Sequence, residues 1–195
     1  VSSAAADVGD ALPLPFTGVV LPASHAAATA SRNGRIGVIG TAATIASGAY
    51  RREIGRVRPA AQVFEQSCPL FVPLVEGGFI DRGDPVTRMV AERYLVPLRE
   101  QKIDTLSLGC THYPIISSII RDVIGDEVQL IDTGAEAARE ADRILDELGL
   151  KNDTEQSGKC SFYVSDRVQG FTTLGSLFLG RDIDGEVLHV DVDTL

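Results

Sequence analysis

The chain has 195 residues and a formal net charge of −9 at pH 7, and 44% of its residues are hydrophobic against 23% charged. This length and composition are typical of one or two packed globular domains and argue against disorder. The negative charge and the lack of a Lys/Arg run argue against nucleic-acid binding, and no apolar stretch approaches the ~20 residues that a membrane span needs.

The first half of the sequence alternates between helical segments and short apolar runs. Ser24 is a residue type that starts helices, and the prolines at 13–15 are helix breakers. The predicted elements are, in chain order, a helix over 1–12, a buried strand over 17–22, a helix over 24–31, a strand over 35–40, a helix over 41–54, a strand over 62–66 and a proline-marked loop over 67–78.

The segment 84–100 predicts a long amphipathic helix. Asp84 suits the N-cap position and Pro85 suits the first helical position. Apolar side chains recur at helical spacing after these two residues. The face that we expect to be buried contains Val86, Met89, Val90, Tyr94 and Leu98.

The second half of the sequence continues the same alternation. Its predicted elements are a strand over 104–108, a helix over 115–125, a strand over 127–132, a helix over 134–149, a polar linker over 151–159, a strand over 160–164, a helix over 168–180 and a strand over 186–190. Repeated strand–helix alternation predicts an α/β fold with a doubly wound parallel sheet. Such folds bind ligands at the carboxyl ends of their strands, where the strand order switches.

Three cysteines, Cys68, Cys110 and Cys160, are spread along the chain without close pairing. No CxxC or His/Cys cluster has the spacing of metal ligands, so we expect neither a disulfide framework nor a metal site. A reducing cytoplasm is the expected location.

The segment 108–114, "LGCTHYP", follows the predicted strand 104–108. Gly109 permits a tight turn or the close approach of a ligand. A helix that begins near Pro114 would point its N–H groups toward Cys110 and lower the pKa of that thiol, and His112 is close enough in sequence to exchange a proton with it. A free cysteine is also commonly a small buried hydrophobe, and position alone leaves both interpretations open.

"LGCTHYP" resembles the second catalytic-cysteine motif of glutamate racemases, in the aspartate/glutamate racemase superfamily. Residues 33–50 resemble the strand–Gly-Thr–helix element of this family, and residues 68–78 resemble its acidic loop. "FYVSD" and "FLGRDI", at 162–166 and 178–183, resemble its C-terminal end. The likeness runs from residue 1 to about residue 182.

The resemblance implies a cofactor-independent enzyme that interconverts L- and D-glutamate and supplies D-glutamate for peptidoglycan, the bacterial cell wall that maintains cell shape. Family members have two similar Rossmann-like α/β domains with the active site in the cleft between them, and they commonly form homodimers. Two cysteines act from opposite faces of the substrate. One removes the α-proton and the other returns a proton from the far side.

The resemblance also implies roles for individual residues. Cys110 corresponds to the thiol that deprotonates L-glutamate, His112 would assist this thiol, and Glu76 would act with the histidine. The residues implied in substrate binding are Thr111, Thr41 and Thr44. Two cysteines, Cys68 and Cys160, are expected to serve packing, and two histidines, His25 and His189, are expected to be ordinary polar residues.

The first catalytic cysteine of the family lies in a "CNT" motif just before a helix that resembles residues 1–6. We therefore expect this chain to lack the first cysteine and the early strands of the N-terminal domain. Residues 1–18 and 132–195 would be the remnant of that incomplete domain, and 19–131 would form the second domain. A chain with one thiol is expected to be inactive as a racemase by itself.

Three alternatives remain from sequence alone. The first is another superfamily enzyme, such as an aspartate racemase or a one-cysteine decarboxylase. The second is a cysteine hydrolase that uses Cys110 as a nucleophile and His112 as its base. The third is a non-catalytic fragment or binding module, in which Cys110 would react with alkylating agents no faster than Cys160.

Overall fold

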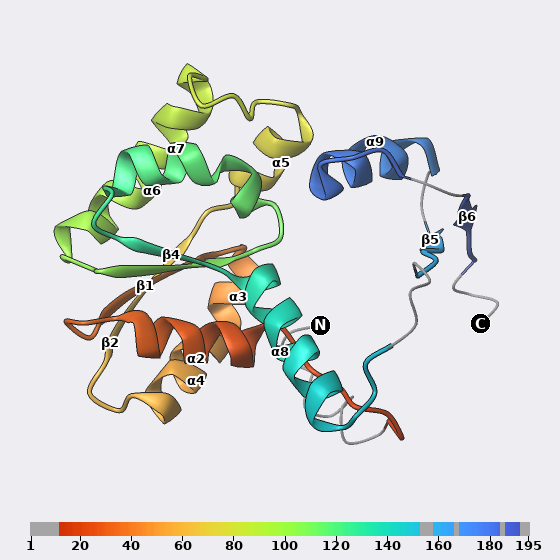
Figure 1. Cartoon of the computed structure of the whole chain (residues 1–195). Helices are drawn as coiled ribbons and strands as arrows, with labels where there is room; N and C mark the ends of the chain where they lie inside the picture. Colours follow the sequence, from red (N-terminus) through yellow and green to blue (C-terminus); the bar gives the residue numbers. More distant parts are fainter. Residues whose placement is uncertain (1–11, 153–157, 166–167, 184–185, 192–195) are drawn as a thin grey trace. The chain divides into compact units, whose positions relative to one another are not determined.

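The computed structural model describes residues 12–152, 158–165, 168–183 and 186–191 (Figure 1). Most of the helix expected over 1–12 lies outside the described residues. The contacts divide the chain into two compact units, Val1–Lys151 and Asn152–Leu195. Each unit is described by itself below.

The first unit contains a four-stranded parallel sheet with the strand order β2-β1-β3-β4. Because the chain goes from β1 to β2 on one side and then returns to β3 on the other, the switch in strand order lies between β1 and β3. The expected parallel α/β sheet is therefore confirmed. The strands are β1 (Arg35–Gly40), β2 (Gln62–Ser67), β3 (Thr105–Gly109) and β4 (Gln129–Asp132).

Helices cover both faces of this sheet (Figure 1). The helices on one face are α2 (Val20–Ala30) and α4 (Ala49–Val57), and those on the other are α6 (Pro85–Glu100) and α7 (Ser117–Ile124). The remaining elements of the unit are the short helices α3 (Ala42–Ser47) and α5 (Phe71–Glu76), the 3₁₀ helix η1 (Tyr113–Ile116) and the longer helix α8 (Thr133–Glu147).

Successive side chains of each strand point to opposite faces of the sheet, so a hydrophobic core forms on each face. In β1, Ile36 and Val38 pack in a buried cluster with residues of α2 and α4, such as Ala27 and Ile54. The fully buried side chains of the other face belong mostly to β3, α6 and α7. They include Leu95, Leu106, Leu108, Ile119 and Ile120. A sheet buried on both faces explains why its strands read as continuous apolar runs.

Four elements differ from the sequence prediction. The predicted strand over 17–22 is wrong, because Val20–Pro22 form the first turn of α2, where a proline costs no hydrogen bond. Ser24 is therefore inside that helix, and not its N-cap. The helix expected over 41–54 is two helices separated by Gly48, which has a φ of 61°. The loop expected over 67–78 contains the helix α5.

The helix α6 begins as predicted, and the burial of Tyr94 and Leu98 confirms part of its predicted face. The Asp84 side chain accepts hydrogen bonds from the N–H groups of Val86 and Thr87, at 2.9 and 2.8 Å. The expectation that Val86 and Met89 are buried is wrong, since both are exposed. Thr87 faces the core instead, because its hydroxyl donates to the Phe79 carbonyl at 2.6 Å. The other buried residues of α6 are Ala91, Tyr94, Leu95 and Leu98.

The second unit contains β5 (Phe162–Val164) paired in parallel with β6 (Val187–His189), and the helix α9 (Val168–Leu179) between them. This order confirms the strand–helix–strand prediction for the tail.

In the first unit, α8 contacts α2. The first compact unit therefore includes α8 and ends at Lys151. The domain boundary expected between residues 131 and 132 stays a prediction.

The close approach of β3 to β1 leaves no room for a side chain at Gly109. A methyl group there would lie 2.7 Å from the Ile39 carbonyl oxygen and 3.2 Å from the Tyr50 ring. We predict that Gly109→Ala lowers the free energy of unfolding by about 1–3 kcal/mol, as overpacking does, in urea denaturation. Gly55→Ala in α4, with open space around it, should be neutral or stabilising. Equal stability of Gly109→Ala and wild type would contradict this account.

Candidate active site

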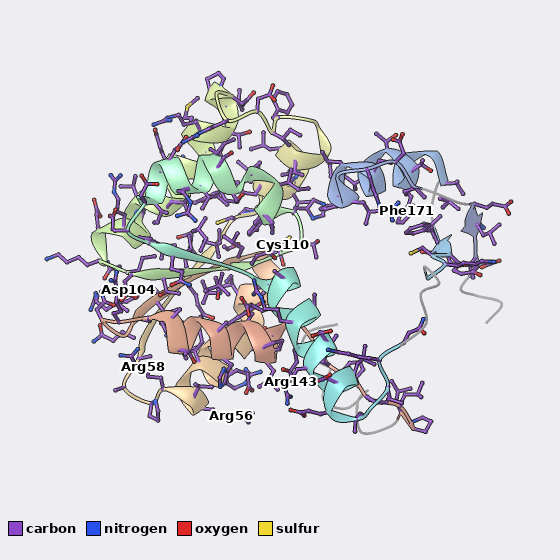
Figure 2. All side chains as sticks on the ribbon, in the orientation of Figure 1. Arg56, Arg58, Asp104, Cys110, Arg143 and Phe171 are labelled. Carbon is purple, nitrogen blue, oxygen red and sulfur yellow. The ribbon has the colours of Figure 1, made fainter. Side chains whose placement is uncertain are left out.

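The carboxyl ends of three neighbouring strands bring the predicted site residues to one edge of the sheet. Gly40 at the end of β1 pairs with Ser67 of β2 on one side and with Gly109 of β3 on the other. Thr41, Cys68 and Cys110, the residues that follow these three, therefore leave adjacent strands at the same level. Figure 2 shows Cys110 at the edge of the sheet from which α8 departs.

A continuous polar chain connects three of these residues. The Cys110 Sγ lies 3.8 Å from Nδ1 of His112, and Nε2 of His112 lies 3.1 Å from Oε1 of Glu76. Because a carboxylate only accepts hydrogen bonds, we assign the imidazole proton to Nε2. In the neutral ring, Nδ1 then presents its lone pair toward the thiol, which is the arrangement that proton transfer between sulfur and nitrogen needs.

Aromatic packing brings the Glu76 helix to the His112 loop. The Phe71 ring in α5 makes edge-to-face contacts with Tyr94 of α6 and Tyr113 of η1, with centroid distances of 5.4 and 5.2 Å. Phe71 and Tyr113 are fully buried. Their packing places the end of α5, which carries Glu76, beside the residue that precedes Tyr113. The hydrophobic core therefore sets the distance between the carboxylate and the imidazole.

The three predicted substrate-binding threonines lie in two groups. The Thr111 hydroxyl is 3.3 Å from Nδ1 of His112, so it belongs to the polar chain. Thr41 caps α3, and its Oγ1 lies 3.0 Å from Oγ1 of Thr44. This hydroxyl pair stands at the end of β1, the strand beside the one that ends at Cys110. The structure thus gathers all six predicted residues at one sheet edge.

The expectation that a helix N-terminus lowers the pKa of Cys110 is wrong. Burial raises this pKa, and the Glu76 charge raises it further, while the His112 backbone N–H and the Thr111 side chain act in the opposite direction. The physical reason is that burial outweighs the effect of the backbone N–H group at the start of the short 3₁₀ helix η1. The thiol therefore ionises less readily than an ordinary cysteine, and a neighbouring base would favour loss of its proton.

The other cysteine and histidine of the first unit, Cys68 and His25, make no contact in this polar chain. Cys68 is fully buried, as expected for packing, whereas the same expectation for Cys160 is wrong because Cys160 is exposed. His25 on α2 and His189 on β6 are both exposed. Within the described ranges, no group of His, Cys, Asp and Glu has the arrangement of a metal site. Among the same residues, no helix has the length and apolar character needed to cross a membrane.

Two residues that were not selected from the sequence contact the end of β3, just before Cys110. Tyr50 of α4 packs against Gly109, and Thr133 at the start of α8 donates a hydrogen bond to the Leu108 carbonyl at 3.0 Å. Both are buried. The signal available in sequence was the position of Thr133 directly after a predicted strand, but its contact with another strand end depends on the tertiary fold.

The sequence matches the family model described as Asp/Glu/Hydantoin racemase over residues 2–141. The chain is 43% identical over 182 residues to a glutamate racemase of Geobacter metallireducens, covering 93% of this chain and 66% of that protein. It is 44% identical over 170 residues to a glutamate racemase of Chlorobaculum tepidum, covering 87% and 62%. The chain therefore spans somewhat less than two thirds of the length of these relatives.

Two solved structures share the fold along almost the whole chain. A glutamate racemase of Bacillus anthracis superposes with a TM-score of 0.89 at 33% identity, covering 98% of this chain and 71% of that one. A glutamate racemase of Francisella tularensis, solved in complex with D-glutamate, superposes with a TM-score of 0.87 at 32% identity, covering 100% and 71%.

The burial of Cys68 predicts a specific pH dependence of stability. Burial raises the pKa of this thiol in the folded state, so the folded chain keeps a proton that the unfolded chain loses above the ordinary thiol pKa. The free energy of unfolding should fall as pH rises above ~8.5, by about 1.4 kcal/mol per pH unit for this group. In urea denaturation at increasing pH, Cys68→Ala should lack this part of the slope. Parallel slopes for the two proteins would contradict the assignment.

Proposed function

The chain belongs to the Asp/Glu/Hydantoin racemase family, and we propose that it serves the cofactor-independent interconversion of L- and D-glutamate. The observation that carries this proposal is the continuous contact from Glu76 through His112 to Cys110 at the switch point of the sheet. The matching glutamate racemases, one of them solved with D-glutamate, support glutamate as the substrate.

The chemistry requires a base for a weakly acidic C–H bond. We propose that Cys110 removes the α-proton of L-glutamate and that His112 accepts the thiol proton, which prepares the thiolate. Glu76 stabilises the imidazolium that forms in this step. The contacts of His112 with Cys110 and Glu76 support this division of roles, since a thiol cannot act as a base until its own proton has left.

The hydroxyl groups around Cys110 fit the polar ends of an amino acid. The hydroxyl groups of Thr111, Thr41 and Thr44 lie at the ends of β1 and β3, and they would donate hydrogen bonds to a carboxylate bound across these strand ends. Fixed donors of this kind also stabilise the negative charge that develops on the carbanion-like intermediate. We propose that these three residues bind the substrate.

Racemisation needs a second acid on the far side of the planar intermediate. Within the described residues of the first unit, the cysteines are Cys68 and Cys110, and Cys68 is buried in the core. We propose that the second thiol comes from the part of the relatives' length that this chain does not span. The 195-residue chain alone would then exchange the α-proton of L-glutamate without inverting it.

The biological setting follows from this reaction. We propose that the complete protein acts in the cytoplasm as a homodimer and supplies D-glutamate for peptidoglycan. The enzyme would need no metal and no cofactor, because the polar chain and the substrate-binding hydroxyls perform the proton transfers and the charge stabilisation.

We predict that Cys110→Ala, in the complete protein, abolishes interconversion of L- and D-glutamate, with a loss of at least about 10²–10⁴-fold because a positioned base is removed. Cys68→Ala is the matched control and should keep most of the activity, since Cys68 is a core residue. Chiral chromatography of the product measures the rate of interconversion by both variants. Near wild-type turnover by Cys110→Ala would contradict the proposal.

The 195-residue chain allows a separate test in D₂O. Proton NMR should show slow loss of the α-proton signal of L-glutamate, without formation of D-glutamate, and Cys110→Ala should lose this exchange. A covalent adduct on Cys110, detected by mass spectrometry, would favour the hydrolase alternative instead.

A further inference from the structure

The strand end that carries Cys110 rests on a buried tyrosine. Tyr50 is 2% exposed, and its ring occupies the space that a side chain at position 109 would need. This ring and the Ile39 carbonyl oxygen together determine how far Gly109 can move. Tyr50 therefore limits the position of the residue next to Cys110 on one face of the sheet.

The Tyr50 hydroxyl also belongs to a buried hydrogen-bond chain. The Thr133 hydroxyl donates to the Leu108 carbonyl at 3.0 Å, and the Thr133 side chain is the polar neighbour that acts on the pKa of the Tyr50 hydroxyl. Because the single proton of the Thr133 hydroxyl is used in the bond to Leu108, a hydrogen bond between the two hydroxyl groups has Tyr50 as its donor. Burial raises the pKa of Tyr50 to about 12, so this donor keeps its proton throughout the neutral range.

The chain of hydroxyls joins three elements at one point. Tyr50 comes from α4, Leu108 from β3 and Thr133 from α8. Thr133 is the one buried residue of α8, so it is the point at which the start of this helix is fixed to the strand. Leu108 precedes Cys110 by two residues, and both bonds of the chain therefore act on the backbone that presents the thiol.

We propose that Tyr50 and Thr133 are positioning residues that hold the Cys110 thiol within reach of the His112 imidazole. The importance of the contact between the thiol and the imidazole rests on the proposed function. The fixing of the strand end by Tyr50 and Thr133 does not depend on that function. The Sγ–Nδ1 distance of 3.8 Å is long for a hydrogen bond. A small displacement of the strand end would break it, because hydrogen bonds weaken steeply with poorer geometry.

Tyr50→Phe and Thr133→Val each remove one hydroxyl and keep the shape of the side chain. In the 195-residue chain, we expect faster amide hydrogen exchange in a peptide that covers residues 108–112 of either variant. We also expect iodoacetamide to alkylate Cys110 about fivefold more slowly at neutral pH, the factor that loss of one hydrogen bond produces. Thr133→Ser keeps the hydroxyl and should restore both values.

Thr105→Val is the matched control. Thr105 is also a buried threonine with a hydrogen-bonded hydroxyl, but it lies at the opposite end of β3. Urea denaturation measures how much stability Thr105→Val and Thr133→Val each lose. At equal loss of stability, slower alkylation in Thr133→Val alone shows that the strand end has moved. The control should leave the exchange of residues 108–112 and the alkylation of Cys110 unchanged.

A double-mutant cycle identifies the contact that the two residues protect. His112→Ala should slow alkylation of Cys110, and adding Tyr50→Phe to it should cause little further loss, because both changes remove the same contact. Additive losses would overturn the positioning role, as would unchanged hydrogen exchange in Tyr50→Phe and Thr133→Val. If exchange rises but His112→Ala reacts like wild type, the positioning role stands and the proposed thiol–imidazole chemistry fails.

Discussion

The site depends on the close parallel pairing of β1 and β3 at Gly40 and Gly109. Position 109 has no space for a side chain, because the Ile39 carbonyl and the Tyr50 ring already occupy it. This contact aligns the two strand ends, so the Thr41 hydroxyl and the Cys110 thiol emerge beside one another at the switch point of the sheet. Parallel α/β sheets commonly bind ligands at this point.

The polar chain gains its geometry from the hydrophobic core rather than from its own hydrogen bonds. The Glu76 side chain is 50% exposed and that of His112 is 16% exposed, so their contact is partly screened by water and contributes little to stability. The buried rings of Phe71, Tyr94 and Tyr113 determine where α5 ends, and thus where the carboxylate lies. Catalytic groups held by a packed scaffold lose less entropy when the substrate arrives.

The sequence predicted what depends on local pattern. β-Branched apolar runs identified the strands, and Asp84-Pro85 identified the start of α6. The residues that meet at the sheet edge were instead implied by the resemblance of three segments, around Thr41, Glu76 and Cys110, to a known family. The prediction from sequence failed where contacts between distant segments determine the local structure. The prolines near Phe71 indicated a loop, yet aromatic packing makes a short helix there. Met89 was expected in the core, but Thr87 took that place because its hydroxyl binds a loop carbonyl. Tyr50 carries no local signal, and Thr133 has only its position directly after a predicted strand, because the contacts of both residues join three separate elements.

The central claim is that Glu76 holds His112 as an acceptor for the Cys110 proton. Nitrogen-15 NMR of the imidazole tests this most directly, because the two ring nitrogens of a neutral histidine have different shifts. The account predicts that neutral His112 carries its proton on Nε2, and that Glu76→Ala reduces the population of this tautomer. A proton on Nδ1, or a tautomer that does not respond to the loss of Glu76, would contradict the account.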